Sequence, residues 1–71
     1  MAISKEEFVE GIKEAVDEVG DPNSLYNLAI HDFVVLEREL TPHDAVLGLK
    51  LHAIVVAMQD FGTYVKSRAE G

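Results

Sequence analysis

Apolar residues recur at helical spacing along almost the whole chain, in three blocks separated by two turn-forming segments. The blocks cover residues 4–19, 23–40 and 42–68. No stretch alternates apolar and polar residues in the way a half-buried strand does. The pattern therefore predicts an all-α fold, in which three helices form a small bundle within a single helical domain, residues 1–71.

The first block begins and ends with recognisable helix signals. Ser4 is followed three residues later by Glu7, which is the pattern of an N-terminal capping box. Gly20 is a natural residue to follow the last helical turn. One side of this predicted helix is apolar and is expected to be buried: Phe8, Ile12, Ala15 and Val19.

The two connections have different turn chemistry. Asp21, Asn23 and Ser24 surround Pro22, and each of the three could cap the second helix. At the next break, Thr41 precedes a proline, which favours an extended backbone. We therefore expect Thr41 to cap the third helix, with Pro42 and Asp44 in its first turn.

The third block is apolar on nearly every side. A heptad seam holds Leu47, Leu51, Ile54, Met58, Phe61 and Val65, and a second stripe holds Ala45, Leu49, Ala53, Ala57 and Tyr64. A helix of this kind is normally buried. We expect one long, mostly buried helix, with Gly62 as the place where it is most prone to break.

The length of the third helix predicts self-association. It would be about 40 Å long, whereas a compact chain of this size has a radius of gyration of about 11 Å. The chain also contains no cysteine to stabilise so small a domain with disulfides. A homo-oligomer is therefore expected, with a dimer favoured and the heptad seam as its self-association surface.

The net charge of −7 is concentrated near the N-terminus, where residues 1–21 carry seven acids and two bases, giving −5. The acids on the polar side of the first helix form a row: Glu7, Glu10, Glu14, Asp17, Glu18 and Asp21. This row allows three interpretations, namely a solvated face, a docking surface for a protein with a basic surface, and a mimic of nucleic acid that blocks a basic groove. Direct binding to nucleic acid or to anionic lipid requires clustered bases and is not expected.

Location follows from the absence of two signals. The N-terminus is acidic and amphipathic, whereas a signal peptide begins basic and continues apolar. The longest unbroken apolar run is residues 53–58, which is far shorter than a membrane span. We expect a cytoplasmic protein that does not enter a membrane.

The candidate chemistry is limited to three histidines. His31, His43 and His52 could hold a metal or another ligand across the helices, but none follows a glutamate by three residues, as metal-binding bundles require. Ser4, Ser24 and Thr41 are expected in caps or turns, Thr63 and Ser67 lie on the long helix, and there is no phosphate-binding loop. The sequence predicts neither an enzyme nor a cofactor.

The expected function is a non-enzymatic protein-interaction module, a small acidic helical regulator, adaptor or inhibitor of another protein. Products of phage and mobile elements often belong to this class. Two alternatives remain: a ligand- or metal-binding bundle that uses the histidines, and the nucleic-acid mimic.

Overall fold

Three α-helices make up most of the chain in the computed structural model, which describes residues 2–70. They are α1 (Lys5–Gly20), α2 (Leu25–Leu40) and α3 (Ala45–Glu70). No strand occurs within these residues, so the predicted all-α fold of three packed helices is confirmed. The outermost positions of the predicted domain, residues 1 and 71, lie outside the described part.

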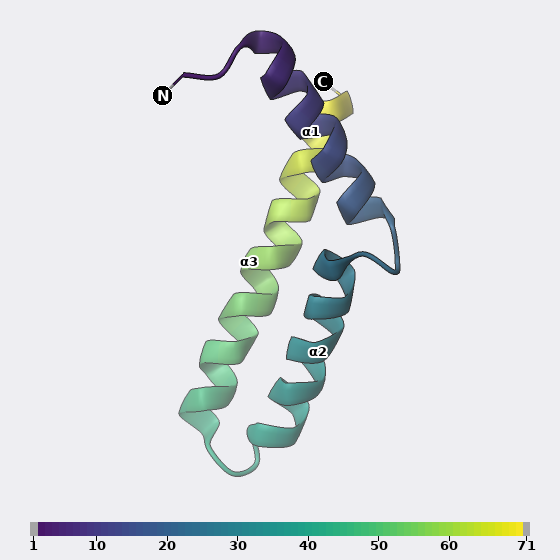
Figure 1. Ribbon diagram of the computed structural model, residues 1–71. Helices are drawn as coiled ribbons and strands as arrows, with labels where there is room; N and C mark the ends of the chain where they lie inside the picture. The colour runs from purple at the N-terminus through teal and green to yellow at the C-terminus, as the bar shows by residue number, and fades with distance from the viewer. Residues whose placement is uncertain (1, 71) are drawn as a thin grey trace.

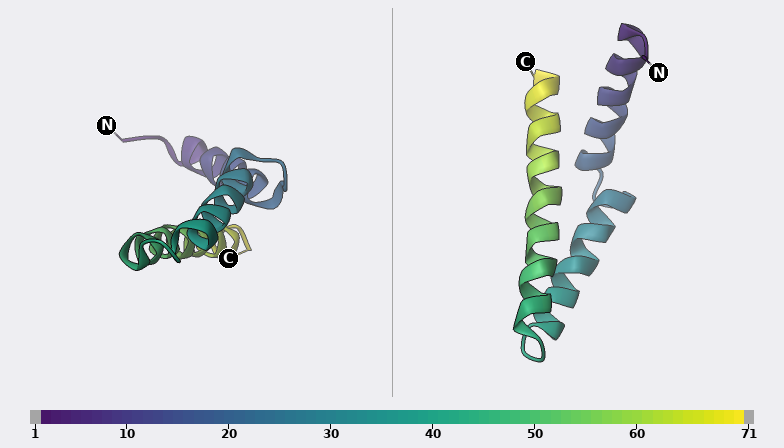
Figure 2. Two further views of the ribbon diagram at one scale, coloured as in Figure 1. Left: turned by 90° about the horizontal axis from the view of Figure 1, so that it is seen from below. Right: turned by 90° about the vertical axis from the view of Figure 1, so that its left-hand side faces the viewer.

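The long helix α3 forms one side of the molecule, and α1 and α2 follow one another along it (Figures 1 and 2). α2 runs antiparallel to the N-terminal half of α3, and α1 lies towards its C-terminal half. The result is an elongated molecule of 48 × 26 × 22 Å. It is two helices wide over most of its length, so much of each helix faces solvent.

The N-terminal cap of α1 agrees with the sequence prediction, and its C-terminal cap does not. Ser4 caps the N-terminus as predicted, and its hydroxyl accepts a hydrogen bond of 3.1 Å from the backbone N–H of Glu7. The prediction for Gly20 was wrong: it is the last helical residue, and its φ is not positive. Asp21 follows in an extended conformation and is the C-cap.

The side chain of Asn27 on α2 completes the end of α1. Its amide donates hydrogen bonds of 2.9 Å to the carbonyl of Val19 and 2.8 Å to the carbonyl of Asp21. The carbonyl of Val19 has no helical N–H to accept from, because the helix ends one residue later, whereas that of Asp21 also accepts from the N–H of Ser24 at 3.0 Å. Of the three possible caps for α2, Ser24 has that role, because its buried hydroxyl accepts from the backbone N–H of Asn27.

The predicted start of the third helix was wrong by three residues. Thr41 has helical φ and ψ, and both its backbone N–H and its hydroxyl donate to the carbonyl of Glu37. These two bonds outweigh the extended preference of a residue before proline and make Thr41 the C-cap of α2. Pro42 lies in the turn, and Asp44 caps α3 by accepting from the N–H of Leu47 at 3.0 Å.

Two glycines mark where the neighbouring helices come closest to α3. The helix is continuous through Gly62, so the expected break there does not occur. A Cβ added at Gly62 would lie 2.5 Å from the hydroxyl oxygen of Tyr26, which donates to the carbonyl of Met58. A Cβ added at Gly48 would lie 2.9 Å from the Cβ of Thr41. Both glycines therefore serve close packing.

The core is a thin seam between α3 and the other two helices. Its buried apolar side chains are Val19, Leu51, Val55 and Val65. On α1, Ile12 and Ala15 are half-buried, as their predicted face requires, but Phe8 is 44 % exposed. The expectation for Phe8 was wrong because α1 diverges from α3 towards its N-terminus (Figure 2).

Candidate functional site

The face of α3 that packs inside the single chain is narrow. It consists of positions spaced 3, 4, 3, 4 and 3 apart: Gly48, Leu51, Val55, Met58, Gly62 and Val65. We call this set the inner face. Two of its members are glycine, so α1 and α2 contact α3 over a strip with little side-chain bulk. One face of the helix is covered, and only 22 % of its most apolar stretch is buried.

The predicted heptad seam is divided between inside and outside. Leu51 and Val65 are buried and Met58 is half-buried, so these three belong to the inner face. The other three members remain exposed, at 39 % for Leu47, 42 % for Ile54 and 51 % for Phe61. Phe61 keeps one intramolecular aromatic neighbour, Tyr26, whose ring centroid is 6.0 Å away.

The side of α3 that points away from α1 and α2 carries the large apolar side chains of this helix that are most exposed. Leu49 is 70 % exposed, Tyr64 64 % and Val46 63 %. We define the outer face as six exposed positions spaced 4, 3, 4, 3 and 4 apart: Val46, Lys50, Ala53, Ala57, Asp60 and Tyr64. Its centre lies about 150° around the helix axis from that of the inner face.

Composition alone also makes α3 compatible with a membrane. Among the helices of residues 2–70, it is the one long and apolar enough to cross a bilayer, with a mean hydropathy of 1.3 over its most apolar stretch. The core helix of a soluble protein meets the same criterion. The longest unbroken apolar run in the sequence, residues 53–58, does not indicate this property, because Lys50, His52, Gln59 and Asp60 interrupt the apolar residues.

The acidic row of α1 is exposed to solvent along its whole length. All six of its predicted members are exposed, namely Glu7, Glu10, Glu14, Asp17, Glu18 and Asp21. One lysine lies beside the row: the ammonium of Lys13 is 3.6 Å from a carboxylate oxygen of Glu10, and both side chains are about two-thirds exposed. Exposed pairs of this type contribute little. The row therefore presents a largely uncompensated negative surface to solvent.

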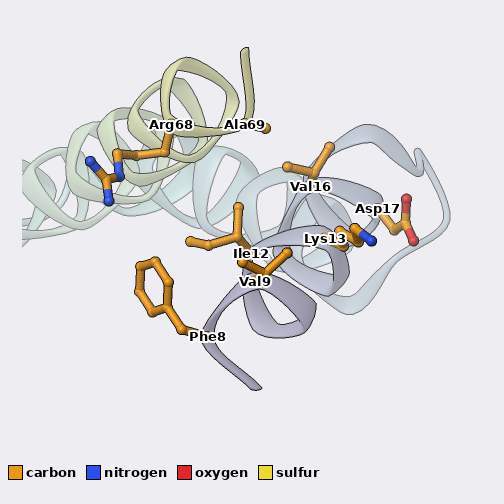
Figure 3. Close-up of a pocket in the computed structure, with 8 residues that line it drawn as sticks. All are labelled: Phe8, Val9, Ile12, Lys13, Val16, Asp17, Arg68 and Ala69. Atoms are coloured by element: carbon orange, nitrogen blue, oxygen red, sulfur yellow. The ribbon is translucent and has the colours of Figure 1, made fainter. Parts of the chain in front are cut away.

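An open groove lies between the apolar side of α1 and the C-terminal end of α3 (Figure 3). Its volume is about 340 Å³. Phe8, Val9 and Ile12 form its α1 side, and Arg68 and Ala69 stand across from them. The groove lies where α1 diverges from α3 towards the N-terminus of α1 (Figure 2).

The three histidines lie on different parts of the fold. His31 is on α2, His43 is in the turn before α3, and His52 is on α3. His52 Nδ1 lies 3.2 Å from a carboxylate oxygen of Glu37, so this histidine joins α2 to α3. Across the described part of the chain, no group of three or more histidine or carboxylate side chains is placed to hold a metal ion.

Sequence reasoning missed two features that the structure brings out. Asn27 and Tyr26 bond across helices, and polar residues within an apolar pattern give no indication of such partners. Lys50 and Asp60 were not recognised as parts of one exposed face. The sequence did offer one indication of this face, because the two residues carry opposite charges and lie ten positions apart on the same predicted helix.

Comparisons with protein-family models, with curated proteins and with solved structures find no match to this chain. The surfaces described above are therefore the basis for assigning a function.

Proposed function

We propose that this protein is a non-enzymatic interaction module that acts as a homodimer. In this proposal it is a small acidic regulator, adaptor or inhibitor of another cytoplasmic protein. The observation that carries the proposal is the exposed apolar surface of α3, where Leu49, Tyr64 and Val46 are each more than 60 % exposed. Contiguous apolar surface of this kind on a small soluble protein marks an interaction site.

The dimensions of the single chain support self-association. Its accessible surface is 5583 Å², whereas a compact monomer of this mass exposes about 4,400 Å². Its radius of gyration is 15.1 Å, against about 11 Å for a compact chain. A second copy that covers the exposed side of α3 would remove much of this excess apolar surface.

The acidic row of α1 is the proposed docking surface for a partner with a basic surface. Its carboxylates are all exposed, and one of them, Asp17, also borders the apolar groove. A single-sign surface of this type accelerates encounter with a partner of opposite charge and fixes its orientation. Dimerisation through α3 leaves this row free.

Charge reversal tests the docking proposal. The triple variant Glu10→Lys, Glu14→Lys, Asp17→Lys should no longer capture the partner in affinity purification followed by mass spectrometry, because the surface then carries both positive and negative charges. Circular dichroism should be unchanged, since all three residues are exposed. A second triple variant, Asp32→Lys, Glu39→Lys, Glu70→Lys, makes the same change in net charge elsewhere and should keep the partner. If both variants bind equally, the row is only a solvated face.

A further inference from the structure

The outer face of α3 is complementary to the same face of a second copy that runs in the opposite direction. Its six positions are symmetric about Val55, so that Val46 corresponds to Tyr64, Lys50 to Asp60, and Ala53 to Ala57. Each position therefore has a counterpart of fitting chemistry: apolar with apolar, base with acid, and small with small. An antiparallel copy of the same helix brings each position opposite its counterpart.

We propose that two copies of this chain pair through their outer faces, with the two α3 helices antiparallel and the two-fold axis at the level of Val55. This inference rests on the proposed dimer and specifies its geometry. In this arrangement Lys50 of each chain faces Asp60 of the other, and Ala53 of each faces Ala57 of the other. The inner face and the acidic row of α1 take no part.

The charges select the antiparallel direction. Lys50 and Asp60 are the only Lys, Arg, Asp or Glu residues between Ala45 and Val65, and both are exposed. They stand about 15 Å apart along the helix. A parallel pair would place lysine against lysine and aspartate against aspartate, which is unfavourable at an interface. An antiparallel pair forms two ion pairs related by symmetry.

The apolar residues beside the outer face fit the same geometry. On one side of the outer face, the two-fold axis places Ile54 of one chain against Ile54 of the other. On the opposite side it places Val56 of one chain against Val56 of the other. Leu47 then comes opposite Phe61. The pairing therefore gives a partner to most of the large apolar residues of α3 that the single chain leaves exposed, namely Val46, Leu47, Ile54, Val56, Phe61 and Tyr64.

The centre of the outer face suits close contact between helix backbones. Ala53 and Ala57 are both exposed, and they are one helical turn apart. Small side chains at such positions allow two helices to approach closely, so that the larger residues beside them interdigitate. Lys50 and Asp60 are the next positions of this face on either side, where their charged groups can pair at the edge of the contact.

A second copy fits this face better than a lipid bilayer does. In a membrane, Lys50 and Asp60 would both lie within the spanning helix, where charged side chains without a partner are strongly unfavourable. In the antiparallel dimer each of these charges meets its opposite. The occupant of the face is therefore expected to be a second copy of this chain, and binding to lipid is an outcome that the experiment must test.

Charge exchange provides the test, with the dimer measured by sedimentation equilibrium at micromolar concentrations. Lys50→Glu alone and Asp60→Lys alone should each raise the dissociation constant on the order of tenfold, because each puts two like-charged pairs in the interface. An equimolar mixture of the two variants should regain wild-type affinity as a heterodimer, since the introduced glutamate then faces the introduced lysine and the native Asp60 faces the native Lys50. The double variant should likewise form a homodimer of wild-type affinity.

Disulfide trapping gives a second readout in a chain that has no natural cysteine. Val46→Cys mixed with Tyr64→Cys should form a crosslinked heterodimer under mild oxidation, whereas Val46→Cys alone should not, because its two copies lie about 27 Å apart in the antiparallel pair. Efficient crosslinking of Val46→Cys alone would show a parallel pair and would overturn the inference.

The outcomes separate the inference from the function on which it rests. A wild-type chain that stays monomeric overturns the proposed dimer itself. A wild-type dimer in which the mixed charge variants show no recovery overturns only the antiparallel geometry. Wild-type protein that co-sediments with phosphatidylcholine vesicles and loses its dimer there shows that the outer face meets lipid, which also overturns the inference.

Discussion

At the level of single residues, Gly48 and Gly62 determine how closely the other helices approach α3. Both lie inside a helix, where glycine is about 1 kcal/mol less favourable than alanine. Gly62 leaves room for the hydroxyl of Tyr26, which bonds to the carbonyl of Met58 one turn earlier. The same glycine that suggested a break from sequence is therefore a contact residue. Gly11 differs, because nothing lies within 4 Å of where its Cβ would be.

The contrast between these glycines yields a prediction for stability. Gly11→Ala should stabilise the fold by up to about 1 kcal/mol through helix propensity. Gly62→Ala should instead destabilise it by about 1–2 kcal/mol, because the new methyl group would lie 2.5 Å from the hydroxyl oxygen of Tyr26. Urea denaturation followed by circular dichroism measures both.

A double-mutant cycle tests the physical reason. In a Tyr26→Phe background the hydroxyl is absent, so Gly62→Ala should cost much less than it does in the wild-type chain. Equal costs in the two backgrounds would show that Tyr26 is not the obstacle and that the effect arises elsewhere along α3.

At the level of the helices, the ends were set by contacts from outside each helix as well as by local caps. Ser4 and Asp44 act locally, and each accepts from an N–H three residues on. The C-terminus of α1 lacks a basic residue in its last turn and is completed by Asn27 of the next helix. The end of one element therefore depends on the register of another.

Removing the amide of Asn27 should loosen α1. Asn27→Ala removes the side-chain donor to the carbonyl of Val19 and one of the two donors to the carbonyl of Asp21, which still accepts from the N–H of Ser24. The loss should cost about 1–2 kcal/mol and raise hydrogen exchange in the last turn of α1. Asn23→Ala is the matched control, because the hydrogen bond that Asn23 makes to Asp21 uses its backbone N–H. Equal exchange in the two variants would show that Asn27 does not hold the end of α1.

At the level of the whole molecule, the single chain buries few apolar side chains and has only a thin hydrophobic core. Four apolar side chains are buried in the described part, and the molecule is 48 Å long but only about half as wide. Small domains without disulfides or metals commonly obtain further stability from oligomerisation. The proposed dimer follows from this geometry together with the exposed outer face.

Such a dimer predicts that stability depends on protein concentration. The thermal midpoint of the wild-type chain should rise by roughly 3–6 °C for each tenfold increase in concentration, because folding is coupled to association. Ala57→Glu, at the centre of the outer face, should lower the midpoint and remove this dependence. Gln59→Glu adds the same charge at an exposed position outside that face and should retain the dependence. A concentration-independent wild-type midpoint would count against coupled dimerisation.

The sequence by itself determined the number and order of the helices. Their periodicity, the turn chemistry of residues 21–24 and the cap at Ser4 depend only on residues that are near one another in the sequence, so they can be predicted without the tertiary structure. The acidic row of α1 was likewise predictable, since charges at helical spacing on one side of an amphipathic helix face solvent. The start of α3 was not predictable in this way, because two hydrogen bonds to Glu37 hold Thr41 as the C-cap of α2.

Only the tertiary structure decided which side of α3 is inside. A helix that is apolar almost all round has several stripes of similar hydrophobicity, so its periodicity cannot rank them. The choice depended on shape, since Gly48 and Gly62 provide the two places where Thr41 and Tyr26 can approach the helix. That choice placed Leu47, Ile54 and Phe61 outside and exposed the face on which Lys50 and Asp60 lie.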